Sequence, residues 1–154
     1  MYKGYKGKFR VKNLQKYQGD ASNITYRSLL ERSFMCYLDT NPNILEWSSE
    51  EKIITYISPL DNRIHRYFPD FWIKFINTDN EIVESIIEIK PAKQTVAPKP
   101  NKTKRRNARY IMEVSTWLVN NAKWEAARAW SEQRGMTFKI ITDTDIKKRY
   151  KYKG

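Results

Sequence analysis

The most constraining feature of the sequence is a succession of short β-type segments between residues 44 and 90. Runs rich in β-branched and aromatic residues lie at positions 44–47, 52–58, 65–76 and 82–90. Turn signals at residues 59–62 and 77–80 separate the later runs. Connections this short can reverse the chain but are too short for the crossover that a parallel pair needs. The segments therefore predict an antiparallel meander.

Helical patterns flank these strands on both sides. The predicted elements are a helix that begins after Ser22 or Asn23 and ends near Asp39, a helical stretch over residues 107–133 with a break near Asn120, a strand over residues 137–142 and a last short helix capped by Asp143. This order of elements predicts an α/β fold in which helices cover the faces of a mixed sheet.

The chain has 154 residues, a length that suits a single domain. We expect residues 21–154 to form that domain, with a mobile basic loop over residues 91–107. Residues 1–20 are basic and poor in aliphatic side chains, so we expect them to form a loosely ordered N-terminal arm.

A net charge of +12 favours a polyanionic partner, since each neutralised phosphate releases counterions. Nucleic acid is the first candidate, and an anionic membrane surface or an acidic protein is the alternative. No apolar run approaches the roughly 18 residues that a helix needs to span a bilayer. We therefore expect no membrane partner.

Acidic residues interrupt two of the apolar strand segments. Asp70 directly follows Pro69, and proline is confined to strand edges, starts or bulges, so Asp70 is predicted at a local distortion. Glu88 and Lys90 are two residues apart and therefore share one face of their strand. Charges at the end of an apolar strand are costly unless they are paired or bind something. Glu31 adds an acid on the first predicted helix, beside its apolar face.

Two carboxylates and a lysine suit the hydrolysis of a phosphodiester. Mg²⁺ prefers oxygen ligands and keeps waters and substrate phosphate oxygens in its shell. A lysine beside the ion can stabilise developing negative charge or orient the attacking water. The alternative is an ordinary edge ion pair between Glu88 and Lys90, with Asp70 capping a turn. The spacing of these residues by itself favours this alternative.

The wider pattern resembles the PD-(D/E)xK nuclease superfamily. Pro69-Asp70, 17 intervening residues and Glu88-Ile89-Lys90 follow the motif of that superfamily, and the helix and strand over residues 123–142 follow its later core elements. The same layout occurs in the endonuclease subunit of heteromeric transposases. A more specific resemblance, to the head completion nucleases of T-even-type tailed bacteriophages, rests on residues 5–10, 46–51, 56–59 and 65–71.

The resemblance implies a restriction-endonuclease-like fold, with a mixed central sheet of about four or five strands flanked by helices. It implies a metal-dependent DNA endonuclease that processes the ends of packaged DNA during phage head completion, before tail joining. Asp70 and Glu88 would bind Mg²⁺, for which Mn²⁺ can substitute, and Lys90 would be the catalytic lysine. Glu31 would be a further ligand, direct or through water, although it could instead be a surface acid paired with Arg27. Gln133 or Lys123 could also approach the site, but nothing in the sequence fixes their positions.

DNA is the expected partner, bound mainly through its phosphates. The candidate phosphate-binding residues are Arg27, Lys93, Lys102, Lys104, Arg105 and Arg106, and a solvated run of charges is the alternative for them. By resemblance, head or neck proteins of a phage are further partners, and the protein acts in the host cytoplasm during assembly, with the virion as a second location. The alternative function is a non-catalytic DNA-binding plug or adaptor at the head vertex.

Overall fold

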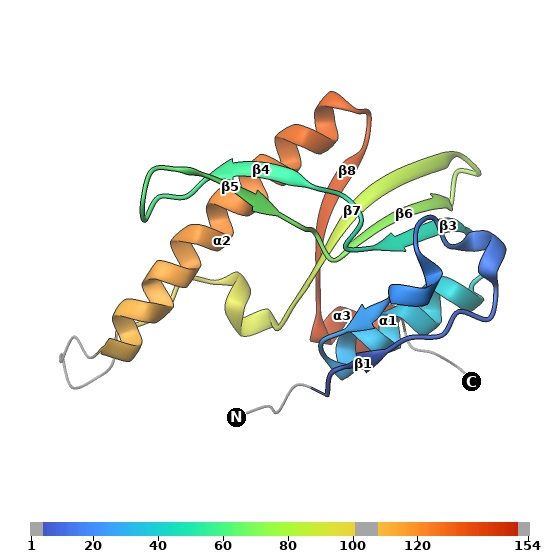
Figure 1. Ribbon diagram of the computed structural model, residues 1–154, viewed down its shortest axis with the longest axis horizontal. Helices are drawn as coiled ribbons and strands as arrows, with labels where there is room; N and C mark the ends of the chain where they lie inside the picture. Colours follow the sequence, from blue (N-terminus) through green and yellow to red (C-terminus); the bar gives the residue numbers. More distant parts are fainter. Residues whose placement is uncertain (1–4, 101–107, 151–154) are drawn as a thin grey trace.

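A mixed four-stranded sheet lies at the centre of the computed structural model, which describes residues 5–100 and 108–150 (Figure 1). Its strands, in spatial order, are β3 (Ile44–Ser49), β6 (Phe71–Ile76), β7 (Ile82–Lys90) and β8 (Thr137–Thr142). The pairs β3–β6 and β6–β7 are antiparallel, whereas β7 and β8 are parallel. This confirms the expected α/β fold with a mixed sheet, as in restriction-endonuclease-like proteins.

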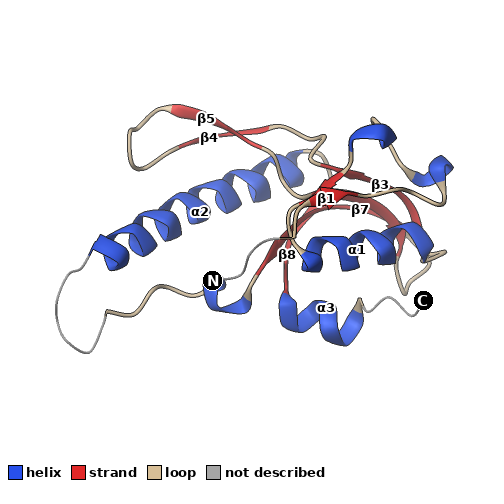
Figure 2. Ribbon diagram, turned by 60° about the horizontal axis from the view of Figure 1, so that its bottom comes forward, coloured by secondary structure: helices blue, strands red, loops and turns tan. Residues whose placement is uncertain are grey.

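Helices cover both faces of this sheet, as Figure 2 shows. On one face lie α1 (Leu29–Thr40) and α3 (Asp143–Arg149), and on the other lie α2 (Ala108–Gln133) and a separate hairpin of β4 (Ile54–Ile57) and β5 (Ile64–Tyr67). The smaller elements are the pair β1 (Gly7–Lys8) and β2 (Thr25–Tyr26) and the 3-10 helices η1 (Leu14–Lys16), η2 (Ala21–Asn23) and η3 (Ala92–Thr95). Within the described residues, no helix is both long and apolar enough to cross a bilayer.

The main core lies between the sheet and the pair α1–α3. Phe34 and Leu38, one turn apart on α1, are fully buried there. Ile87 and Ile89 of β7 point to the same core, because alternate residues of a strand share a face. The residue between them, Glu88, belongs to the opposite face, which α2 and the hairpin cover.

Two predicted element boundaries are wrong: the start of the first helix and the continuity of the strand over residues 65–76. The first helix begins at Leu29, because the hydroxyl of Ser28 accepts a hydrogen bond from the backbone N–H of Glu31 and caps the helix there. The predicted strand over residues 65–76 is divided into β5 and β6 at Pro69. Strands β4 and β5 pair only with each other, so a single meander through all the predicted strands is wrong, although its last antiparallel pair, β6 with β7, is confirmed.

The later helices also differ from their predictions in detail. Helix α2 is continuous through Asn120, and the amide of Asn121 donates to the carbonyl of Trp117 one turn earlier. Helix α3 is capped by Thr142 in a capping box with Asp145, one residue before the predicted cap.

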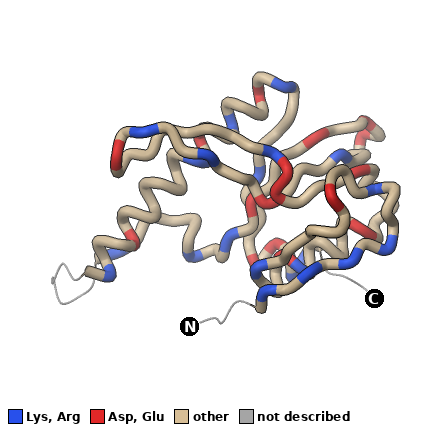
Figure 3. Tube along the Cα trace, in the orientation of Figure 1, with Lys and Arg blue, Asp and Glu red and all other residues tan. Residues whose placement is uncertain are grey.

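The segment over residues 5–20, predicted as part of a loose arm, packs against the domain in the structure. Tyr17 is buried and meets Trp47 edge to face, with 4.8 Å between the ring centroids. The buried carboxylate of Asp39 on α1 accepts the backbone N–H groups of Lys12 and Asn13, at 2.8 and 3.2 Å. Figure 3 shows Lys and Arg recurring along this segment, and most of these side chains are exposed, so the segment presents a basic surface.

We expect Asp39→Asn to lower the free energy of unfolding by about 1.5–3 kcal/mol. The carboxylate offers two acceptor oxygens to the N-terminal segment, whereas an amide offers one and carries no charge. Urea unfolding followed by circular dichroism measures the change. Asp79→Asn, in the exposed turn before β7, is the matched control and should have little effect. Equal stability of the two variants would contradict the anchoring role of Asp39.

Candidate active site

Asp70 is held where three strands of the sheet meet. Pro69 has no backbone N–H to offer a neighbouring strand, and β6 begins only at Phe71. The side chain of Asp70 takes over the next contact with β7, because its Oδ2 accepts the N–H of Ile89 at 2.7 Å. The carbonyl of Asp70 accepts the N–H of Glu50, just beyond β3, at 3.1 Å. The predicted distortion therefore exists, and it aims a carboxylate at the end of β7.

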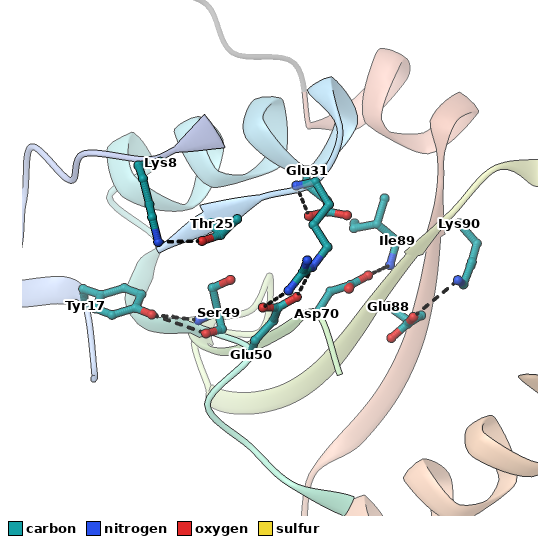
Figure 4. A network of polar contacts seen from close by, with 11 residues as sticks. Lys8, Tyr17, Thr25, Glu31, Ser49, Glu50, Asp70, Glu88, Ile89 and Lys90 are labelled. Carbon is teal, nitrogen blue, oxygen red and sulfur yellow. Dashed lines mark hydrogen bonds and ion pairs between the residues drawn. The ribbon is translucent and has the colours of Figure 1, made fainter. Parts of the chain in front are cut away.

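Glu88 lies on β7 with only 6% of its surface exposed. Its Oε2 accepts a hydrogen bond from the hydroxyl of Tyr67. Its Oε1 lies 3.8 Å from Nζ of Lys90 (Figure 4). The predicted common face of Glu88 and Lys90 is confirmed by this contact. The predicted ion pair between Glu88 and Lys90 exists too, but it lies on an inner strand rather than at an edge of the sheet, and beside a second acid.

Asp70 and Glu88 form a desolvated pair of like charges. Burial raises the pKa of Asp70 well above its ordinary value, and the charge of Glu88 raises it further. Burial also raises the pKa of Glu88, against the opposing effects of the Tyr67 hydrogen bond and the charge of Lys90. Both carboxyl groups therefore hold protons more tightly than ordinary acids, and a bound cation would relieve their repulsion.

Glu31 lies on the α1 side of the same pair (Figure 4). Its Oε2 accepts the backbone N–H of Arg27 at 2.9 Å, which ties this acid to the start of α1. Burial raises the pKa of Glu31, and the charge of Glu50 adds to this rise. The charge of Glu31 in turn raises the pKa of Asp70, so the structure does bring this predicted residue to the site.

Arg27 and Glu50 form a two-pronged ion pair at the rim of the site. The Nε and Nη2 groups of Arg27 donate to the two carboxylate oxygens of Glu50, at 2.9 and 3.2 Å. Glu50 has a left-handed backbone with φ of 54° at the end of β3. The sequence reasoning missed Glu50, although an acid directly after a buried strand is a signal that could have identified it.

Lys123 and Tyr67 are the other site residues that the sequence did not assign. The ammonium of Lys123, on α2, lies 5.5 Å from the ring centroid of Tyr67, whose hydroxyl binds Glu88. Gln133, by contrast, is exposed at the far end of α2. The topology explains the difference, since α2 crosses the Glu88 face of the sheet and only its middle passes the acids.

The predicted DNA contacts are distributed unevenly in the structure. Lys93 is exposed in η3, three residues after Lys90. Arg27 is at the site, but its guanidinium is paired with Glu50. The predicted contacts Lys102, Lys104, Arg105 and Arg106 lie outside the described residues.

The donor set at the site suits a magnesium ion. Across residues 5–100 and 108–150, no three His, Cys, Asp or Glu side chains form a ready group for a metal ion. The donors are thus the two carboxylates of Asp70 and Glu88, both hard oxygen ligands. Mg²⁺ accepts such a pair, because it fills its other positions with waters and phosphate oxygens. Softer metals that select thiolate or imidazole have no matching donors in this pair.

Comparison with known proteins gives two matches. Residues 41–143 match the family model described as TnsA-like endonuclease N terminal. Over 145 residues, the chain is 42% identical to the head completion nuclease of Enterobacteria phage T4, an alignment that covers 93% of this chain and 94% of that relative. The residues matched by the family model include Asp70, Glu88, Lys90 and Lys123, but they begin after Glu31.

We expect Asp70→Asn to raise the melting temperature of the metal-free protein at neutral pH. Because the pKa of Asp70 is raised in the folded state, the folded protein binds the proton more tightly than the unfolded chain. The free energy of unfolding therefore falls as the pH rises from the ordinary value of 3.8 through the raised pKa. A gain of 1 kcal/mol would correspond to about 2–4 °C in a chain of this size.

Thermal unfolding in a chelator, followed over a pH series, measures this effect. Asp70→Asn should flatten the pH dependence as well as raise the midpoint. Glu46→Gln, a half-buried acid on β3, is the matched control and should do neither. A drop in melting temperature for Asp70→Asn at neutral pH would show that the acid pair is not under electrostatic strain.

Proposed function

This chain belongs to the family of TnsA-like endonucleases, and from that membership we propose that it is a metal-dependent DNA endonuclease that hydrolyses phosphodiester bonds. The observation that carries the proposal is the desolvated pair Asp70–Glu88 with Lys90 beside it. Two adjacent buried carboxylates oppose folding unless a cation compensates them. Strongly perturbed acids of this kind are typical of functional sites.

In the proposed site, Asp70 and Glu88 hold Mg²⁺, or Mn²⁺ in its place. When bound, the ion supplies a water of lowered pKa and offsets charge on the scissile phosphate. Lys90 orients the attacking water or donates a hydrogen bond to a phosphate oxygen. The Oε2 of Glu31 is engaged by the N–H of Arg27, so its Oε1 would be the oxygen available to the ion, directly or through a water.

DNA would lie across the basic surfaces on both sides of the acids. On one side, a cavity of about 360 Å³ is lined by four cationic side chains from the N-terminal segment and α1: Lys8, Arg10, Lys12 and Arg32. Lys93 lies on the other side, just after β7. Arg27 and the basic residues at 102 and 104–106 would be further phosphate contacts. Nonspecific phosphate binding agrees with the net charge of +12.

The relative from Enterobacteria phage T4 suggests the biological role. We propose that the protein processes the ends of packaged DNA during phage head completion, in the host cytoplasm and before tail joining, where head or neck proteins would be its partners. A structural plug that binds DNA without cutting it would need the basic surfaces but not the acid pair. A substitution of Asp70 therefore distinguishes the two roles, because only the nuclease needs this acid.

Purified protein is expected to nick supercoiled plasmid in Mg²⁺ or Mn²⁺ and to lose this activity in a chelator. Asp70→Ala, Glu88→Ala and Lys90→Ala should each lower the rate at least about 100-fold, because each removes a metal ligand or a charge aimed at the phosphate. Gel assays of plasmid nicking measure the rate. Glu46→Gln and Lys74→Ala, on neighbouring strands, are the matched controls for charge.

If wild type and all three site variants cleave equally, the nicking comes from a contaminant and the proposed nuclease function is contradicted. The plug is tested in phage. If Asp70→Ala particles contain the folded protein yet remain fully infectious, the structural role suffices.

DNA affinity should fall steeply with salt, and the double change Arg10→Ala/Lys12→Ala should lower the log–log slope by about 1.8, or about 0.9 for each lost phosphate contact. The Lys12 change leaves its backbone N–H free to bind Asp39, so the fold should persist. Fluorescence anisotropy over a salt series measures the slope. The control variant Arg128→Ala/Lys139→Ala removes the same charge elsewhere on the surface. An equal salt slope for the two double variants would exclude the cavity as a DNA contact.

A further inference from the structure

Helix α2 brings a second lysine to the acid pair. We propose that Lys123 is a further catalytic residue, which binds a non-bridging oxygen of the scissile phosphate alongside Lys90. This inference rests on the proposed nuclease function and extends it to a residue outside the Glu88–Lys90 strand.

The position of Lys123 is set by the buried residues that follow it on α2 and by two tyrosines of the hairpin. Its neighbour Trp124 is 4% exposed, and Ala127, one turn further, is fully buried against β4 and β5. The ammonium lies 5.5 and 5.8 Å from the ring centroids of Tyr67 and Tyr56, one on each strand of the hairpin. Two aromatic faces thus hold the cation by cation–π attraction, and they leave its N–H donors unused.

The charges around Lys123 are those of the proposed active site. Burial lowers the pKa of Lys123, and the positive charge of Lys90 lowers it further, while Glu88 and Asp70 oppose this change. The four side chains therefore lie within electrostatic reach of one another. Tyr67 connects them directly, since its ring faces the ammonium and its hydroxyl donates to Glu88.

Lys123 has no oxygen partner in the described part of the chain. Neither a hydrogen bond nor an ion pair joins its ammonium to any carboxylate or carbonyl there, whereas Lys90 has Glu88 within 4 Å. A half-buried ammonium with free donors suits an anion supplied from outside. A phosphate oxygen delivered to the acid pair meets that description.

The chemistry gives such a cation a role. In hydrolysis, the oxygen of water bonds to phosphorus, the bond from phosphorus to the leaving sugar oxygen breaks, and that oxygen takes up a proton released by the water. Negative charge builds on the phosphate oxygens as this occurs. A preorganised donor that meets this charge typically contributes about 10²–10³-fold to the rate.

The test uses the full chain with Lys123→Ala, Lys123→Gln and Lys123→Arg. Arg128→Ala is the matched control, because it removes the same charge from an exposed position on α2 five residues after Lys123. Single-turnover nicking of supercoiled plasmid in Mg²⁺ gives the rate, and anisotropy in Ca²⁺ gives the DNA affinity. We expect the Ala and Gln variants to lose about 10²–10³-fold in rate with little loss of affinity. The Arg variant, which keeps a cation, should recover part of the rate.

Three outcomes would overturn this inference. Nicking by Lys123→Gln within about threefold of wild type, less than 1 kcal/mol of barrier, would show that the ammonium only packs between the tyrosines. An equal loss in Arg128→Ala would show a general effect of charge. A loss in Lys123→Gln that circular dichroism traces to unfolding, with no recovery in Lys123→Arg, would show a structural role. If wild type itself does not nick, the proposed function fails first, which separates the two failures.

Discussion

Two carboxyl groups that repel each other are kept together where β6 begins and β7 nears its end, on the inner strands of the sheet, and much of the surrounding structure serves that constraint. Asp70 is tied to β7 through the N–H of Ile89, and Glu88 is bound by the hydroxyl of Tyr67. Lys90 adds a partial counter-charge. These contacts reduce the cost of burying the pair without removing it, since the pKa of each acid stays raised. A bound cation would relieve the repulsion that remains between them.

One face of the sheet carries the main apolar core, and the other carries the charged groups of the site. The face toward α1 and α3 is a continuous apolar core, with Trp47, Phe34 and Phe71 packed against one another. The opposite face combines a smaller apolar cluster with the Glu88–Lys90 pair and the tyrosines of the hairpin. Because β7 contributes to both faces, a rigid core lies directly behind the charged groups and fixes their spacing.

Strand periodicity and a proline act locally, so they predicted the strand segments and the distortion at Asp70, and helical spacing predicted the helices. The Asp70–Glu88–Lys90 group was predicted only through the resemblance to PD-(D/E)xK nucleases, because its spacing alone favoured an ordinary ion pair. The sequence could not predict that β4 and β5 leave the sheet, since pairing partners depend on contacts distant along the chain. For the same reason the sequence could not place Tyr67 or Lys123 beside the acids, because only the packing of the hairpin and α2 brings them there. Ser28, which starts α1, was readable in principle, because Glu31 three residues later is a capping signal.

The position of the β4–β5 hairpin has a consequence for how this protein can vary. The hairpin is inserted between β3 and β6 along the chain, yet it shares no ladder with either strand. Lengthening or shortening its tip at residues 58–63 would leave the register of the central sheet unchanged. Both of its strands contact Lys123, β5 through Tyr67 at the base and β4 through Tyr56 close to the tip. Natural or engineered tips could therefore change the surroundings of Lys123 while the sheet that carries the acids stays constant.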